Sequence, residues 1–150
     1  LFGNPGQPGK FNAMTLVRGE DFDSGDVVEF TRGDGGSAGQ LGAGGNGDSS
    51  TLKVNDITVT AAGGDGGTGF RVLSAGVGYG PGNFEYNGRL FVGGGDQAVT
   101  GAAGVAPGGA GNGGTGWGIQ AGGAGAPGGA WGVFRQEPGE EIHHSGRGSH

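Results

Sequence analysis

Two short patterns in this sequence contain residue types that perform chemistry or recognition elsewhere. Residues 35–39, GGSAG, match the G-x-S-x-G string of a serine nucleophile, which needs a preceding strand, a following helix, and Asp and His partners. The flanking sequence predicts no such arrangement, and a chain with 44 glycines matches glycine patterns by chance. Residues 32–34 spell the integrin tripeptide RGD, which we interpret as a strand end followed by a turn. We therefore expect no catalytic residue and no enzyme activity.

Two further patterns could hold a metal ion. Residues 44–48, GGNGD, approach the calcium-binding repeat G-G-x-G-x-D, but Asp48 stands one position early and the pattern does not recur in tandem. Glu140, His143 and His144 have a ligand-like spacing only if that segment is helical, and exposed tail histidines are the simpler interpretation. We expect no metal and no cofactor.

Aromatic side chains are the better candidates for binding, because aromatic residues in loops commonly recognise saccharides or proteins. Trp131 alternates with Val133 on a predicted closing strand and is expected in the core. Trp117 lies among glycines, where it could form a surface patch, a cap or a subunit contact. The candidate surface or interface residues are Tyr79, Phe84, Tyr86 and Trp117, with the turn residues Asn55, Asp56 and Asn87.

Two predicted hairpins position most of these residues. Residues 51–60, TLKVNDITVT, form a hairpin with Asn55 and Asp56 at its tip, since both residue types tolerate the left-handed conformation that a two-residue turn requires. Its predicted buried face pairs Val54 with Ile57 and Leu52 with Val59, and leaves Lys53 and Thr58 on the other face.

The second hairpin spans residues 84–92, FEYNGRLFV, and contains the strongest local signal in the chain. Asn87-Gly88 between alternating residues is the preferred type I′ turn. The predicted register places Phe84 opposite Phe91, and Tyr86 opposite Arg89 in a pair suited to a cation–π contact.

Other short strands are predicted at residues 13–18, 26–32, 70–73 and 130–136, and no helix is predicted. Between these elements glycine recurs every third residue, as at Gly122, Gly125 and Gly128. A polyproline II helix has three residues per turn, so this period places the glycines on one edge, where backbones can approach closely. We therefore expect a mainly β and irregular fold, with hairpins beside a bundle or sandwich of glycine-rich polyproline II type helices.

Composition sets limits on these expectations. Glycine without a strict period also leaves disorder as an alternative, because each ordered glycine costs about 0.5–1 kcal/mol more entropy than alanine. The net charge of −6 argues against nucleic-acid binding, and the absence of cysteine excludes disulfides. No apolar run is long enough for a transmembrane segment.

The predicted organisation has three parts. Residues 1–12 form a Gly-X-Y-like leading segment, which could be the end of a collagen-like stalk or, as we prefer, one polyproline II segment. Residues 13–136 form the glycine-rich domain, and residues 137–150 a polar, flexible tail. Because the sequence opens at Leu1, we expect it to be a piece of a longer chain.

The order of these features resembles the glycine-rich C-terminal domain of minor tail proteins from phages of mycobacteria and related actinobacteria. The matching stretches are MTLVRG at 14–19, GGNGDSST at 44–51, ITVTAAGG at 57–64, FEYNGRLFVGG at 84–94, APGGAGNGG at 106–114 and GGAGAPGGAWGVFRQ at 122–136. The resemblance covers residues 10–136. It implies a virion structural protein at the phage tail tip, extracellular when acting, with a contribution to host attachment. It implies other tail proteins and the host cell envelope as partners, and self-association, for which a homotrimer is one form.

Two alternatives stay open at this point. A cellular glycine-rich surface or ice-binding bundle would favour a flat threonine ridge, but Thr58, Thr60, Thr68 and Thr115 show no regular period. A calcium-dependent adhesin would need a stability that rises with calcium.

Overall fold

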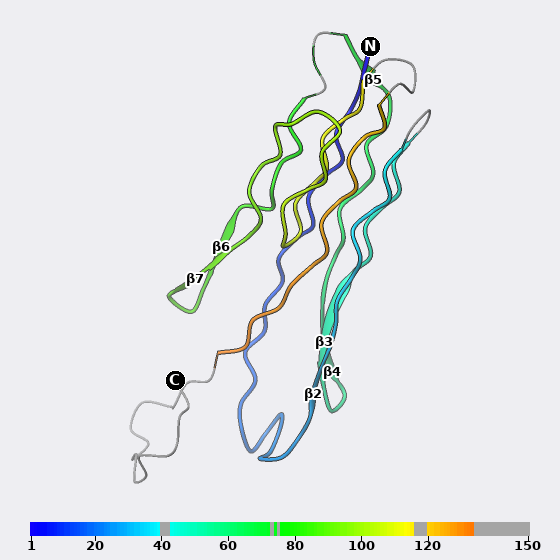
Figure 1. Ribbon diagram of the computed structural model, residues 1–150. Helices are drawn as coiled ribbons and strands as arrows, with labels where there is room; N and C mark the ends of the chain where they lie inside the picture. Colours follow the sequence, from blue (N-terminus) through cyan, green and yellow to red (C-terminus); the bar gives the residue numbers. More distant parts are fainter. Residues whose placement is uncertain (40–42, 73, 75, 116–119, 134–150) are drawn as a thin grey trace.

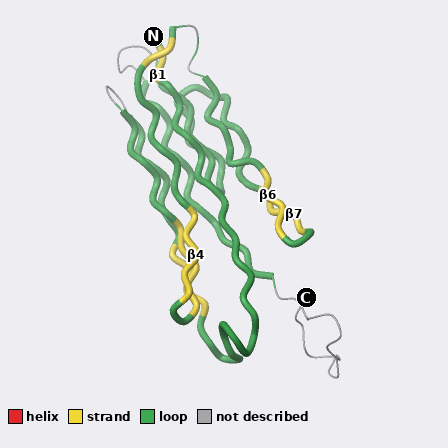
Figure 2. The backbone as a smooth tube through the Cα atoms, turned by 180° about the vertical axis from the view of Figure 1, so that it is seen from behind, coloured by secondary structure: helices red, strands yellow, loops and turns green. Residues whose placement is uncertain are grey.

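The protein is an elongated assembly of extended segments with little regular secondary structure. The computed structural model describes residues 1–39, 43–72, 74, 76–115 and 120–133. Within these residues there is no α-helix, and the strands are short and antiparallel. The segments run side by side along the long axis of the molecule, and most of their length is drawn as loop (Figures 1 and 2). The predicted mainly β and irregular fold class is confirmed at this level.

A three-stranded sheet occupies one side of the lower end (Figure 1). It has the order β2 (Val28–Thr31), β3 (Ser50–Val54) and β4 (Ile57–Ala61). The β3–β4 hairpin has the predicted register, with Val54 opposite Ile57 and Leu52 opposite Val59. Lys53 and Thr58 are exposed on the other face, as predicted, whereas Val54 is only 4% exposed.

The second hairpin, β6 (Asn83–Tyr86) and β7 (Arg89–Val92), extends from the opposite side of the molecule (Figure 1). Phe84 pairs with Phe91 and Tyr86 with Arg89, which confirms the predicted register. The turn residues Asn87 and Gly88 have φ angles of 49° and 73°. Both values lie in the left-handed region that a type I′ turn requires, so the Asn-Gly pair sets the hairpin locally.

A two-stranded sheet lies at the upper end of the molecule (Figure 1). β1 (Phe2–Gly3) pairs antiparallel with β5 (Phe70–Arg71). The strand predicted at 70–73 is therefore shorter than expected, and residue 73 lies outside the described residues. The pairing partner, β1, was not predicted.

The strand predicted at 13–18 does not form. Only Arg18 takes part in a bridge, with Phe22. The side chain of Asn12 accepts a hydrogen bond from Ala13 N at 2.8 Å, and Asp21 accepts one from Val17 N at 2.7 Å. Because local side chains satisfy these backbone groups, the segment has an alternative to a strand ladder.

The prediction of a closing strand at 130–136 is also wrong for the residues that the structure describes. Residues 130–133 belong to no strand within the described part, and residues 134–136 lie outside it. Trp131 is 45% exposed, so it is not a core residue. Its ring instead packs against other aromatic rings at the open lower end.

Six glycine-rich segments form the body of the molecule. In chain order they are segment I (residues 2–10), segment II (33–39), segment III (43–49), segment IV (62–69), segment V (108–115) and segment VI (120–128). Each is extended along the long axis (Figure 1). Three additional extended stretches, residues 76–82, 93–97 and 101–105, lie beside segments V and VI. The hydrogen bonds from Ala110 N to Tyr79 O, from Asn112 Nδ2 to Gln97 O and from Gly104 N to Ala124 O show these contacts.

Backbone hydrogen bonds join the six segments at intervals of about three residues. In segment VI, the amides of Gly122, Gly125 and Gly128 donate to Gly39, Gly36 and Gly33 of segment II at 2.9–3.0 Å. The residue after each of the first two also donates, but to segment V: Gly123 N to Asn112 O and Ala126 N to Gly109 O. Successive residues of segment VI therefore donate hydrogen bonds to segments on different sides of it.

Segments I and III follow the same rule. Segment I donates from Asn4, Gln7 and Lys10 to segment IV, and from Gly3 and Gly9 to segment V. Segment III donates from Gly44 and Gly47 to segment IV, and from Gly45 and Asp48 to segment II.

These bonds close a ring in which mainly donating segments alternate with mainly accepting segments. At its two ends segment V also donates to segment VI, from Gly108 N to Pro127 O and from Thr115 N to Gln120 O. Going round, the order is segment I, IV, III, II, VI, V and back to I. Segments I, III and VI donate to both ring neighbours, and segments II, IV and V accept from both. In each pair of neighbouring segments, the residue numbers of the donors rise as those of their acceptors fall. Every neighbouring pair is therefore antiparallel. Pro5 and Pro8 occupy the third position of segment I, where no amide is needed for the ring.

At most of their glycines the acceptor segments have no room for a side chain. A Cβ placed on Gly64 of segment IV would overlap the carbonyl oxygen of Gln7, and one on Gly111 of segment V would overlap that of Gly123. Residues 109–114 of segment V are all buried, and Asn112 is 2% exposed. The Asn112 amide donates to Gln97 O at 2.8 Å. The interior is thus built from close backbone contacts more than from apolar side chains.

Candidate functional site

An elongated cavity of about 740 Å³ is the main candidate site. Its lining comes from all six segments of the ring and, at the lower end, from the β2–β4 sheet and the β6–β7 hairpin. Ligand sites in proteins commonly have volumes of about 300–1,000 Å³ and mainly apolar walls. The cavity is therefore large enough to hold a small molecule.

An aromatic cluster forms one wall of the lower cavity. Phe11 stacks on Phe84 with ring centroids 5.3 Å apart and planes 13° apart, and it contacts Trp131 at 6.0 Å. Phe84 stacks in turn on Tyr86 at 6.2 Å, and Phe91 meets Trp131 at 5.6 Å. Rings at these separations stabilise one another by roughly 0.5–1.5 kcal/mol per pair beyond burial. We call these five residues the aromatic cluster.

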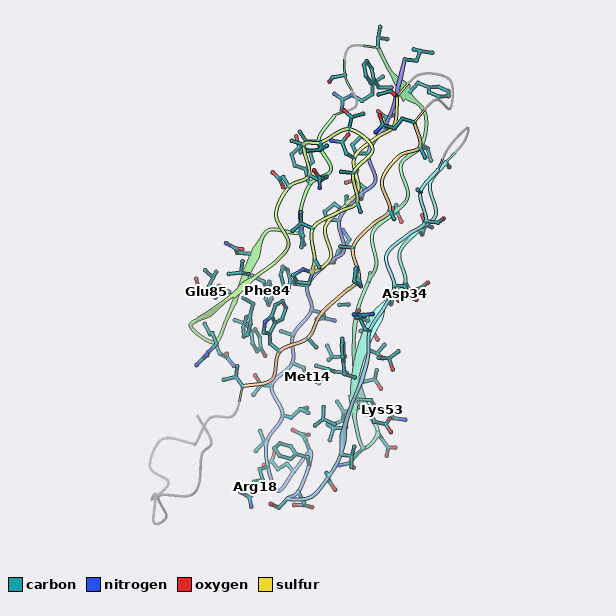
Figure 3. The ribbon with its side chains drawn as sticks, in the orientation of Figure 1. Met14, Arg18, Asp34, Lys53, Phe84 and Glu85 are labelled. Carbon is teal, nitrogen blue, oxygen red and sulfur yellow. The ribbon has the colours of Figure 1, made fainter. Side chains whose placement is uncertain are left out.

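The facing wall is the inner side of the β2–β4 sheet. Phe30, Leu52 and Val59 lie side by side on its three strands, and all three line the cavity. Met14 lies between this sheet and the β6 strand that carries Phe84 (Figure 3). Phe30 is 43% exposed and Met14 is 46% exposed, so the lower cavity opens to solvent.

A small polar group stands beside the aromatic cluster. The hydroxyls of Thr15 and Tyr86 are 2.7 Å apart, and Asn87 Nδ2 donates to Thr15 Oγ1 at 3.1 Å. Thr15 thereby ties the tip of the β6–β7 hairpin to the segment that follows Phe11. This contact fixes the hairpin that carries three of the five clustered rings.

The upper cavity is lined by backbone of all six segments, including the donor glycines. A Cβ on Gly9 would lie 3.4 Å from Ala62 O and 3.7 Å from Gly108 O, so it would point between segments IV and V. Gly47 and Gly122 have the same relation to their own two neighbours, at 3.4–3.6 Å. All three glycines line the cavity. Because these walls are largely backbone, the interior presents polar atoms as well as Cα–H groups.

The predicted site residues Phe84, Tyr86 and Asn87 are brought together at this cavity. The sequence interpretation missed three partners, Phe11, Phe91 and Trp131, as site residues. A signal for Phe11 was present: Phe2, Pro5, Pro8 and Phe11 follow a three-residue spacing, which would place them along one edge of segment I. Phe91 was predicted opposite Phe84 but was not recognised as a binding residue.

The other predicted residues lie elsewhere. Tyr79 is 60% exposed and does not line the cavity. Trp117 lies outside the described residues. Asn55 and Asp56 are exposed at the tip of the β3–β4 hairpin. They do not join the aromatic cluster.

Asn55 has a structural role at its tip. Its Nδ2 donates to Asp26 Oδ2 at 2.9 Å and to Asp21 O at 3.1 Å, which braces the acidic turn before β2. The hydrogen bond from Asn55 lowers the pKa of Asp26, and the backbone amide of Asp23 lowers it further. Both donors favour the carboxylate, so this turn is best braced while Asp26 is ionised.

Ser37 is the serine of the GGSAG pattern considered for catalysis. Ser37 is exposed in segment II, where its carbonyl accepts from Gly45 N. Within the described ranges, no three His, Cys, Asp or Glu residues are grouped so that they could bind a metal. Glu140, His143 and His144 lie outside these ranges. The described part also contains no helix with the length and apolarity needed to cross a membrane.

Comparison with known proteins adds no assignment. No protein-family model matches the chain, and no curated protein matches it significantly.

Proposed function

We propose that this protein is a non-enzymatic structural module of a phage virion, located at the tail tip, which presents the aromatic cavity to the host surface. The observation that carries the proposal is a framework of close backbone contacts that holds an open cavity lined by five aromatic rings. The resemblance of residues 10–136 to glycine-rich minor tail proteins supports the same role. The proposed partners are other tail proteins, further copies of this chain, including a homotrimer, and the host cell envelope.

The proposal includes a finer description of the framework. We propose that segments I to VI are polyproline II type helices packed through glycine. Such a helix turns once in three residues, so its amides point in three directions in turn. The bonding of segment VI supports this geometry: one amide in three donates to segment II, the next donates to segment V, and the third donates to neither.

Amide hydrogen exchange tests this description. We expect Gly122, Gly123, Gly125 and Ala126 to exchange at least about tenfold more slowly than Ala121 and Ala124, after correction for intrinsic rates, because only the first group donates in the ring. The measurement is residue-resolved exchange by NMR. Protection of alternate residues instead would indicate β-strand geometry and would contradict the polyproline II proposal.

Cell binding tests the function itself. We expect the fluorescently labelled chain to bind intact mycobacteria or related actinobacteria, and Trp131→Ala to weaken that binding about thirtyfold, since a central interface tryptophan commonly contributes about 2 kcal/mol or more. Leu90→Ala, on the outer face of the same hairpin, is the matched control and should bind like the parent. Equal binding by parent and Trp131→Ala would exclude the cavity as the attachment surface.

A further inference from the structure

We infer that the centre of the six-segment ring binds a seventh extended chain, a run of glycine that a different polypeptide inserts. The inference rests on the polyproline II description proposed above and does not depend on attachment to a host. Three observations carry it: the directions in which the segments bond, a set of backbone amides that face the cavity, and glycines that the ring itself does not require.

The bonding pattern defines the shape of the ring. Each segment bonds both ring neighbours mainly through one kind of group on successive residues, as segment VI does from Gly122 and Gly123. With three residues per turn, successive amides point about 120° apart. Six such corners form a hexagon, whose centre is as far from each segment as neighbouring segments are from each other. The cavity that all six segments line therefore has room at its centre for one further segment of the same kind.

Six glycine amides face this centre. In a planar trans peptide the N–H points away from the C=O of the preceding residue. In segment V the carbonyl of Gly113 points outward, where it accepts from Gly101 N, so the amide of Gly114 points to the centre. The equivalent amides of the three acceptor segments all line the cavity and belong to Gly36, Gly39, Gly64, Gly67, Gly111 and Gly114. Within the described residues, none of these six amides donates a hydrogen bond.

A seventh amide of this series shows the direction directly. Gly33, three residues before Gly36, donates to Ser50 Oγ at 2.9 Å. Ser50 is 8% exposed and lines the cavity. Its hydroxyl thus supplies, for one amide, the acceptor that the other amides of the series need. Gly36, Gly111 and Gly114 are buried, and a buried amide without a partner costs free energy.

One extended chain supplies acceptors in the required directions. The amides form two sets of three, one in Gly36, Gly64 and Gly111 and the other three residues later in each segment. A Cβ on Gly47 would lie 3.5 Å from the nitrogens of both Gly36 and Gly64, which places these two at one level. Segments II, IV and V occupy alternate corners of the hexagon, so the three amides of a set converge on the centre. A polyproline II chain presents successive carbonyls about 120° apart, so six residues pair with all six amides.

The donor glycines are explained by the same occupant. A Cβ on Gly3, Gly9, Gly47 or Gly122 would meet its nearest neighbours at 3.4–3.6 Å, which is ordinary contact. None of the four has a φ angle in the left-handed region. Neither space nor conformation within the ring therefore requires glycine there, although an ordered glycine costs more entropy than alanine. All four line the cavity, where a central chain would leave no room for a Cβ.

The occupant is a glycine run from a different protein. The ring segments place side chains on their outer side, as Ala38 and Asn46 do. A central chain is surrounded by six segments and has no such side, so all six of its residues must be glycine. The longest run of glycine in this sequence is residues 93–95, so a second copy offers no segment that fits. Main-chain hydrogen bonds would provide the affinity, as they do when a peptide adds a strand to a sheet.

Calorimetric titration of the full chain with a peptide of seven glycines, flanked by paired lysines for solubility, is the first test. The matched control peptide has alanine in place of every glycine. Each peptide is added to the folded chain and, separately, during refolding from urea, so that slow entry does not hide binding. We expect the alanine peptide to bind at least about tenfold more weakly, because its Cβ atoms would overpack the ring. Equal binding of both peptides, or no binding of the glycine peptide under either condition, would overturn the inference.

Residue-resolved amide exchange locates the peptide. In the chain alone, we expect the six inward amides to exchange at least about tenfold faster than Gly122 and Gly123, after correction for intrinsic rates. The glycine peptide should slow the six by about tenfold or more and leave Gly122 and Gly123 little changed. Equal protection in the monomer without peptide would contradict the inference. Protection that appears only with self-association, followed by sedimentation, would assign the site to a second copy and exclude a different protein.

An alanine variant tests the site within this chain. Gly47→Ala should fold with unchanged stability, because its Cβ enters at ordinary contact distance, and should weaken peptide binding at least about tenfold. Gly122→Ala repeats the test if Gly47→Ala does not fold. Gly95→Ala, whose Cβ meets nothing within 4 Å and does not line the cavity, should bind like the parent. A folded Gly47→Ala or Gly122→Ala that binds the peptide like the parent would overturn the inference.

The proposed attachment role fails independently. Cell binding by a chain that does not bind the glycine peptide would remove this inference alone, and peptide binding without cell binding would remove only the attachment role.

Discussion

Replacing Gly111 by valine is expected to lower the free energy of unfolding by at least about 3 kcal/mol, or to prevent folding. A Cβ at this buried position would overlap the carbonyl of Gly123 and lie 2.7 Å from Ala124 O. The clash is with backbone, so no rotamer change relieves it. Segments V and VI would have to separate, which would break the bonds from Gly123 N to Asn112 O and from Ala126 N to Gly109 O.

The measurement is a urea unfolding curve for the parent and the variant. Gly95→Val is the matched control, because a Cβ on Gly95 meets nothing within 4 Å and the residue is exposed. The control should unfold within about 0.5 kcal/mol of the parent. If Gly111→Val unfolds at the same urea concentration as the parent, close glycine packing does not hold this framework together.

Replacing Phe11 by alanine should lower the free energy of unfolding by about 2–3 kcal/mol. Phe11 is half-buried and contacts both Phe84 and Trp131, so its loss separates the rings of the hairpin from the ring of segment 130–133. Trp131 should then become more exposed. Its fluorescence emission, measured in a Trp117→Phe background, should shift to longer wavelength.

Leu90→Ala provides the comparison for Phe11. Leu90 is on the outer face of the β6–β7 hairpin and 56% exposed, so its truncation should cost less than about 1 kcal/mol and leave the Trp131 emission unchanged. A Phe11→Ala variant that is no less stable than Leu90→Ala would show that the aromatic stack does not anchor the hairpin.

The parts of this fold that could be predicted from the sequence are those set by neighbouring residues. Asn55-Asp56 and Asn87-Gly88 define both hairpins and their registers, because the left-handed residues Asn55, Asn87 and Gly88 and the alternating side chains act within ten residues. The three-residue glycine spacing predicted close backbone contacts. It could not predict which segments are neighbours, since segment I bonds residues about 60 and 105 positions further along the chain.

The errors have the same cause. Residues 13–18 have strand-forming side chains, but Asn12 and Asp21 supply local acceptors and no strand of the sheet pairs with them. Trp131 alternates with Val133 as a buried strand residue would. Burial, however, depends on what faces the residue, and here it faces an open cavity. The aromatic cluster combines residues from three separate parts of the chain, so local pattern could predict only its hairpin members.

The alternation of ascending and descending segments imposes a parity rule on how an antiparallel ring of this kind can change. Loss of one segment would bring two segments of the same direction together, and the ring would no longer be antiparallel throughout. The ring can therefore grow or shrink only by pairs, one ascending and one descending, which is what insertion or deletion of a hairpin supplies. Within a segment, length can change by three residues without rotating the later amides away from their partners, whereas a change of one residue misdirects all of them.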